Sequence, residues 1–167
     1  MTTELFPIVN EQGECIGSAT RKECHSGTFI LHPVVHLHVF NPLGHLLLQK
    51  RSLSKDIQPG RWDTAVGGHV DYGESIEAAL HREAREELGI EFNSAEKIVS
   101  YVFTSKVERE LVNTFRITTT QEHFNFDPVE LDDVRFWSID EIRANLGKGI
   151  FTPNFESEFT KYLSCKS

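Results

Sequence analysis

The stretch from residue 67 to residue 90 constrains the fold more than any other part of the chain. It reads GGHVDYGESIEAALHREAREELGI, and its second half is rich in residues that favour helices. Ser75 can cap a helix N-terminus, and Gly89 stands where a helix commonly stops. The sequence therefore predicts a helix over residues 75–88, and the position of its charged residues decides what the helix can pack against.

Two glutamates lie on the side of this helix that should face the core. At about 100° per residue, Glu83 and Glu87 fall within roughly 20° of Ile76, and Glu86 lies at the edge of the same arc. Taking carboxylates out of water is costly unless a partner compensates the charge. A divalent cation such as Mg²⁺ or Mn²⁺ would do so, because hard oxygen ligands suit these ions, and Arg82 would then hold Glu86 in place. The alternative is a solvated charged helix stabilised by pairs such as Arg82 and Glu86.

Composition limits the compartment and the classes of partner. The chain has 167 residues, of which 39% are hydrophobic and 25% charged, and it contains no apolar run long enough to cross a membrane. Its net charge of -8 disfavours nucleic acid and anionic membranes as partners. Cys15, Cys24 and Cys165 are widely spaced, and the N-terminus lacks a secretory signal. We therefore expect a single cytoplasmic domain over residues 1–167.

The rest of the chain predicts mainly strands. Residues 5–9 and 14–19 flank the turn-rich tetrad NEQG and predict a β-hairpin, so that residues 1–22 form an N-terminal extension that could lie in the contact of a homodimer. Further strands are predicted at 28–40, 45–50, 97–105, 111–119 and 134–137, further helices at 138–146 and 153–163, and a loop at 52–62. This pattern is typical of an α+β or mixed α/β fold.

Two further groups of residues lie outside the acidic helix. His36 and His38 alternate with apolar neighbours, which predicts that both point to one half-buried face of a sheet. Phe136 and Trp137 precede the Ser138 helix and are predicted to belong to the core. We expect a structural role for both groups.

The acidic helix and the residues before it resemble the Nudix signature, Gx5Ex7REUxEExGU, where U is a bulky aliphatic residue. Its fixed places are filled by Gly68, Glu74, Arg82, Glu83, Glu86, Glu87, Gly89 and Ile90. Ala84 stands where a larger aliphatic residue is usual, a departure that concerns packing more than chemistry. The order of the predicted elements is also similar to the Nudix fold, which implies an α/β/α sandwich around a mixed β-sheet.

The resemblance implies an activity, because enzymes of this family hydrolyse a diphosphate bond linked to an organic group. It implies a site for one or more Mg²⁺ or Mn²⁺ ions formed by the Gly67 carbonyl, Glu83, Glu86 and Glu87. Arg82 and Glu74 would orient these groups, and the substrate would be a small organic or nucleoside diphosphate compound. The proton of the attacking water could pass to a motif glutamate or to an acid such as Glu108 or Glu110.

A second resemblance points to one branch of this fold, the isopentenyl-diphosphate isomerases. The chain shares with them an FNxxG turn, a PGxW stretch, and basic residues that imply diphosphate binding by Arg51 and Lys55. The alternative for these two residues is an ordinary place on the surface. The isomerases also bind a metal through histidines and glutamates, and the corresponding candidates are His25, His32, His69, Glu108 and Glu110. Imidazole ligands would favour Mn²⁺ or Zn²⁺, whereas each histidine taken alone could equally be structural or exposed.

One departure separates the chain from those isomerases. At the position of Gly67 they carry a catalytic cysteine, and none of this chain's cysteines stands at an equivalent place. The carboxylates needed for hydrolysis are all present. We therefore predict a metal-dependent diphosphate hydrolase. The alternatives are an isomerase-like enzyme and a non-catalytic, ligand-binding Nudix module, for which loss of motif glutamates is the usual mark.

Overall fold

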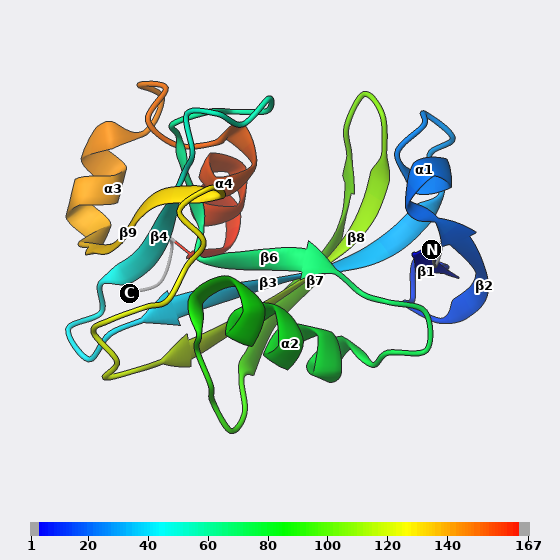
Figure 1. Ribbon diagram of the computed structural model, residues 1–167, viewed down its shortest axis with the longest axis horizontal. Coiled ribbons are helices and arrows are strands. Elements are labelled where there is room, and N and C mark those ends of the chain that lie inside the picture. The colour runs from blue at the N-terminus through cyan, green and yellow to red at the C-terminus, as the bar shows by residue number, and fades with distance from the viewer. Residues whose placement is uncertain (1–3, 164–167) are drawn as a thin grey trace.

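The fold is built on one seven-stranded mixed sheet with a separate two-stranded hairpin beside it (Figure 1). The computed structural model describes residues 4–163, so Cys165 and both ends of the predicted domain lie outside the described residues. The strands of the large sheet are β3 (Leu31–Phe40), β4 (Leu46–Arg51), β5 (Trp62–Thr64), β6 (Val66–His69), β7 (Glu96–Thr104), β8 (Arg109–Thr118) and β9 (Leu131–Trp137). Strand β3 pairs in parallel with β8 and antiparallel with β4 and β6, so the sheet is mixed, as predicted.

Three of the helices lie close to the predicted positions, and the short first helix is additional. The helices are α1 (Arg21–Cys24), α2 (Ile76–Leu88), α3 (Ile139–Asn145) and α4 (Pro153–Glu158), which continues into a π-helical segment, η1 (Phe159–Leu163). At the start of α2 the Ser75 hydroxyl accepts a hydrogen bond from the Ala78 amide, and at its end Gly89 has a φ of 66°. Both predicted caps of the acidic helix are therefore confirmed.

Apolar residues of the sheet pack on helices on both of its faces. Leu37 of β3 and Leu47 of β4 contribute to a core that also contains Leu80 of α2. The neighbouring Leu46 lies in a second core with Phe155 of α4. Because adjacent residues of β4 enter different cores, the sheet is covered on both sides, and Figure 1 shows α2 on one side of the molecule with α3 and α4 near β4 and β9. This arrangement is the expected α/β/α sandwich.

The two aromatic residues before α3 are both part of the core, as predicted. Trp137 is buried in the core beneath α3 and α4, and Phe136 packs against the core beneath α2. They are adjacent residues of β9, so they point to opposite faces of the sheet.

Four segments differ from the sequence-based expectation. The strand predicted from residue 28 begins at Leu31, and the short helix α1 was not predicted. Strands β5 and β6 were not predicted either, because they are short and β6 contains Gly67 and Gly68, which have low strand propensity. A four-residue strand with two glycines is nevertheless useful in this position, since it lets side chains from β3 and α2 approach its backbone.

The N-terminal hairpin covers one end of the large sheet. It consists of β1 (Leu5–Val9) and β2 (Cys15–Thr20), as predicted to within one residue. Phe6 is fully buried with Cys24 of α1, and the Tyr72 amide donates to the Leu5 carbonyl. The hairpin thereby holds α1 beside the segment that follows β6. Within residues 4–163, no helix is both long and apolar enough to span a membrane.

Candidate active site

A cleft of about 460 Å³ brings together most of the residues singled out in the sequence. Its walls come from α2, β6, the end of β4 with the loop after it, and the loop before β9. The predicted residues that line it are Arg51, Lys55, Gly67, Gly68, His69, Arg82, Glu83, Glu86 and Glu87. Glu74 does not line the cleft and reaches it only through its contact with Arg82.

Arg82 is the central link among the acidic residues. Its Nε and Nη2 atoms donate to the two carboxylate oxygens of Glu74 at 2.8 and 2.9 Å, while Nη2 also donates to the His69 carbonyl at 3.0 Å. Its Nη1 atom lies 2.8 Å from a Glu83 oxygen and 3.4 Å from a Glu86 oxygen. The hydrogen bond from Arg82 lowers the pKa of Glu74. Arg82 therefore holds Glu74 and Glu83 firmly, and Glu86 less tightly than expected.

The Glu83 carboxylate lies against the backbone of β6. A Cβ atom added to Gly68 would be 2.3 Å from the Glu83 carboxyl carbon, which is closer than atoms can approach. Only glycine at this position lets Glu83 keep its place between Arg82 and the strand. The first glycine of the motif thus has a steric function.

Glu87 is the most deeply placed of the three motif glutamates. Gln49 of β4 donates to Glu87 Oε1 at 3.4 Å, whereas Glu87 Oε2 is buried and has no hydrogen-bond partner among the described residues. Burial, together with the adjacent Glu83 carboxylate, raises the pKa of Glu87 well above its usual range. The pair could be stabilised by a cation, because a bound positive charge would satisfy the unpaired oxygen and reduce the repulsion.

The third motif glutamate lies at the mouth of the cleft. The Glu86 side chain is 60% exposed, and its ion pair with Arg82 is 3.4 Å long. Its carboxylate is thus accessible to solvent, in contrast to that of Glu87. Glu86, which was predicted at the edge of the apolar arc of the helix, therefore lies at the edge of the cleft.

Basic side chains line the cleft opposite the glutamates. The Lys55 ammonium forms an ion pair with Glu130, and Arg51 Nε donates to the Ile57 carbonyl at 2.9 Å. A third cation, Arg21 of α1, also lines the cleft and pairs with Glu4 at 2.8 Å. These cations lie within reach of an anionic ligand in the cleft, but each already has a protein acceptor.

Sequence reasoning missed several residues of the cleft. Arg21 and Glu4 belong to the N-terminal segment, and only the packing of the hairpin brings them to the site. Asp127 and Glu130 lie in a loop without a recognisable pattern. Gln49 did carry a signal, since it is a polar residue that follows three leucines in a buried strand.

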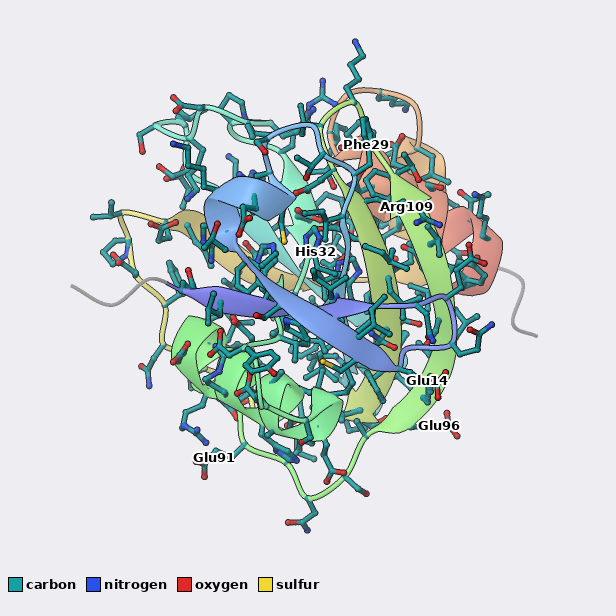
Figure 2. All side chains as sticks on the ribbon, turned by 90° about the vertical axis from the view of Figure 1, so that its right-hand side faces the viewer. Glu14, Phe29, His32, Glu91, Glu96 and Arg109 are labelled. Carbon is teal, nitrogen blue, oxygen red and sulfur yellow. The ribbon has the colours of Figure 1, made fainter. Side chains whose placement is uncertain are left out.

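The five residues of the histidine–glutamate set are also brought together, at the end of β3 beneath the hairpin. His25 Nε2 lies 3.2 Å from His69 Nε2 and 2.8 Å from Glu108 Oε2. His32 and Glu110 are register partners in the parallel β3–β8 pair, with His32 Nε2 3.9 Å from Glu110 Oε2. Figure 2 shows His32 in the interior of the molecule. These donor atoms could hold a metal ion.

The electrostatics of this cluster favour the neutral form of His32 and His69. His32 Nδ1 lies 3.0 Å from the Ile30 carbonyl, to which it must donate, so the buried Nε2 atom carries a lone pair and lacks a partner among the described residues. Burial lowers the pKa of His32, and burial together with nearby Arg21 lowers the pKa of His69 to about 3. Burial and the neighbouring Glu108 raise the pKa of Glu110 to about 7. Neutral imidazoles are the form in which histidine binds metals.

His36 and His38 share one sheet face, as predicted, but that face is more buried and more polar than expected. Both contact Glu158 of α4, a carboxylate that is only 2% exposed. His36 Nδ1 lies 2.9 Å from Glu158, and the Tyr101 hydroxyl also donates to this carboxylate. Although burial opposes the charged form of His36, the charge of Glu158 outweighs it and raises the pKa of His36 to about 9. The two histidines are therefore not on an ordinary half-buried face.

Comparison with known proteins places this site in a family. The family model for the NUDIX domain matches residues 30–155. An isopentenyl-diphosphate Delta-isomerase of Clavibacter michiganensis is 34% identical over 120 residues, which are 68% of this chain and 62% of that protein. One from Citrobacter koseri is 40% identical over 94 residues, which are 56% of this chain and 52% of that protein. One from Escherichia coli O1:K1 is 36% identical over 126 residues, which are 72% of this chain and 69% of that protein. The chain thus covers less than two thirds of the first two relatives.

Solved structures agree with this assignment. The Deinococcus radiodurans protein DR0079 superposes with a TM-score of 0.75 at 26% identity, covering 95% of this chain and 98% of that one. A MutT protein from Methanosarcina mazei has a TM-score of 0.66 at 23% identity, with coverages of 78% and 91%, and supports the fold alone. The chain therefore belongs to the Nudix family, in the branch that includes the isopentenyl-diphosphate isomerases.

Proposed function

We propose that the protein is a divalent-metal-dependent hydrolase that cleaves a diphosphate bond in a small organic or nucleoside diphosphate compound. The observation that carries this proposal is the buried Glu87 oxygen that has no partner among the described residues, next to the Glu83 carboxylate. Two such carboxylates need a cation or a shared proton. The donor atoms they offer are all oxygens, which suit Mg²⁺ or Mn²⁺ better than a softer metal.

The residues that would hold the cation are Glu83, Glu87, the Gly67 carbonyl and, at the mouth of the cleft, Glu86. When bound, the cation would neutralise diphosphate oxygens and make an attacking water more acidic. Arg82 keeps Glu83 oriented through its hydrogen bond and is itself fixed by the two oxygens of Glu74. The exposed Glu86 carboxylate is our candidate to accept the proton of the attacking water.

The basic residues of the cleft would position the diphosphate. Lys55 and Arg21 are paired with Glu130 and Glu4, so a bound diphosphate would compete with these carboxylates for the two cations. Arg51 keeps its Nε atom on a backbone carbonyl, which orients its guanidinium group towards the cleft. Such positioning, with charge neutralisation, is the main protein contribution to phosphoryl chemistry.

The proposal is tested by a panel of diphosphate compounds in the presence of Mg²⁺ or Mn²⁺. Sugar nucleotides, dinucleotides, nucleoside triphosphates and isoprenoid diphosphates would be included, and release of phosphate-containing products would be measured. We expect turnover of at least one class that disappears when the metal is chelated. Tight binding of these compounds without turnover would instead identify a ligand-binding module.

The histidine–glutamate cluster favours a second candidate, an isomerase-like enzyme. The cluster has the donor types of the metal site in the isomerase branch, and relatives in that branch carry the isomerase name. Gly67 offers no thiol for protonating or deprotonating an alkene, which is why we rank this activity second. Incorporation of deuterium from D₂O into isopentenyl diphosphate would establish it, and its absence beside active hydrolysis would exclude it.

We also propose that this cluster binds a transition metal, whichever reaction the protein catalyses. In the wild-type protein, saturating Mn²⁺ or Zn²⁺ should raise the melting temperature, since a ligand at a hundred times its Kd adds about 2.7 kcal/mol of stability. The His25→Asn substitution removes one ligand at a half-buried position and should weaken that binding by about tenfold or more. Exposed His123→Asn is the matched control, and equal metal affinity in the two variants would contradict a site at the cluster.

A further inference from the structure

A second pocket of about 120 Å³ opens on the inner side of Glu87. It shares Gln49, Arg51, Gly67 and Glu87 with the large cleft, so the two pockets are adjacent. Every residue that lines this inner pocket is polar, charged or glycine. A small pocket without an apolar wall is not suited to a hydrocarbon group.

His36 forms one wall of the inner pocket, and α4 holds it in place. Its Nδ1 atom is bonded to Glu158, so the other ring nitrogen, Nε2, remains on the side of the pocket. Glu158 also binds His38 and Tyr101, and it is almost completely buried. With three donors on one buried carboxylate, the His36 ring cannot rotate or retreat without breaking this network.

The His36 ring occupies the space that a side chain at position 67 would need. They are register partners in the β3–β6 pair, and a Cβ atom at Gly67 would lie 3.3 Å from His36 Cδ2 and 3.7 Å from His36 Nε2. The first distance is tighter than an ordinary contact, and the ring is held from behind by Glu158. A side chain at position 67 and the imidazole at position 36 therefore compete for one place.

We propose that His36, positioned by Glu158, is a specificity-determining residue that favours a hydroxyl-bearing part of the substrate over a hydrocarbon in the inner pocket. The assignment rests on the proposed function only in placing the diphosphate at the motif glutamates. Imidazole Nε2 can hydrogen-bond a hydroxyl group as donor or as acceptor, so the contact is available in either protonation state. A hydrocarbon in the same place would leave this nitrogen and its polar neighbours unpaired.

The charged groups around the inner pocket are of both signs. Asp63 and Glu87 contribute acidic groups, while Arg51 and His36, whose pKa Glu158 raises to about 9, contribute basic groups. A hydroxyl group can donate to either carboxylate and accept from Arg51. With the diphosphate placed beside the motif glutamates of the outer cleft, the inner pocket is left for the hydroxyl-bearing group.

The experiment compares two ligands that differ by one group. These are the 2-hydroxyethyl and n-propyl esters of methylenediphosphonate, whose P–C–P bridge cannot be hydrolysed, and their affinities are measured by calorimetry with Mg²⁺. We expect the wild-type protein to bind the hydroxyethyl ester about tenfold more tightly, because the propyl ester leaves buried polar groups unpaired. Equal affinities in the wild-type protein would overturn the proposal without any variant.

Matched substitutions locate the preference at His36. His36→Met and His36→Gln replace the ring by side chains of similar size, and only glutamine keeps a hydrogen-bonding end. Methionine should reduce the preference to about threefold or less, while glutamine and the exposed control His123→Gln should retain most of it. Gly67→Ala tests the same point from the other side, since its methyl group would occupy the space beside the held ring and hinder the contact of Nε2 with the ligand, which should reduce the preference. A preference that survives His36→Met or Gly67→Ala in folded protein would refute the role of His36.

The outcome separates this inference from the proposed function. The corresponding cleavable diphosphate esters are assayed in parallel for release of phosphate-containing products. A binding preference without any hydrolysis would contradict the proposed hydrolase and leave the inner-pocket assignment standing. Hydrolysis of both esters together with equal affinity for both analogues would support the proposed hydrolase and overturn the inner-pocket assignment.

Discussion

Glu87→Gln should lower kcat/KM for diphosphate hydrolysis by about a hundredfold or more and leave the fold intact. Glutamine has nearly the same shape, but it presents an amide in place of the oxygen that is buried without a partner among the described residues. A neutral side chain also removes the repulsion with Glu83 that raises the pKa of Glu87. In the absence of metal, the melting temperature of the variant should therefore equal or exceed that of the wild-type protein.

The same variant tests the metal independently of turnover. Saturating Mg²⁺ should raise the melting temperature of the wild-type protein and should have a much smaller effect on Glu87→Gln. Glu91→Gln is the matched control, because it makes the same chemical change at an exposed residue just beyond α2, at the periphery of the molecule in Figure 2. Full activity in Glu87→Gln would refute the assignment of a catalytic cation to this helix.

Arg82→Lys should be the second most damaging substitution, although it preserves the charge. We expect a fall of about 10- to 100-fold in kcat and a loss of about 1–2 kcal/mol in the free energy of unfolding. A lysine ammonium cannot bind both oxygens of Glu74 while also reaching Glu83 and the His69 carbonyl, as the guanidinium group does. Glu83 would then lose the contact that fixes its orientation.

Steady-state kinetics and urea denaturation would measure both effects. Arg85→Lys is the appropriate control, since Arg85 is exposed on the same helix and does not line the cleft. An Arg82→Lys protein with normal kcat would show that Glu83 is oriented without this hydrogen bond. A change in KM alone would place Arg82 in substrate binding and not in positioning the glutamates.

The sequence predicted best those features that short-range patterns determine. The ends of α2 were predicted because Ser75 and Gly89 are local signals, and both caps are present. The convergence of Glu83 and Glu87 followed from helical periodicity, and the cleft was anticipated by the motif that contains them. The fold class followed from the same kind of reasoning, since the alternation of strands and helices limits the possible arrangements.

Features that depend on distant pairings could not be predicted in this way. Arg21 reaches the cleft only because the hairpin packs over the end of the sheet. Glu158 meets His36 from the far end of the chain, and its sequence context suggested only an amphipathic helix. Strand β6 was not predicted because its two glycines have low strand propensity. They are needed there because the side chains of His36 and Glu83 approach their backbone closely.

The parallel pairing of β3 with β8 also has a consequence for biosynthesis. All ten residues of β3 pair with residues between Arg109 and Thr118. The central strand of the domain therefore cannot form this pairing until β8, which is synthesised much later, has left the ribosome. Until then its apolar residues and one of its edges remain available to other chains. Pairings between such distant segments form slowly, and we expect the nascent domain to depend on chaperones until its last third has been translated.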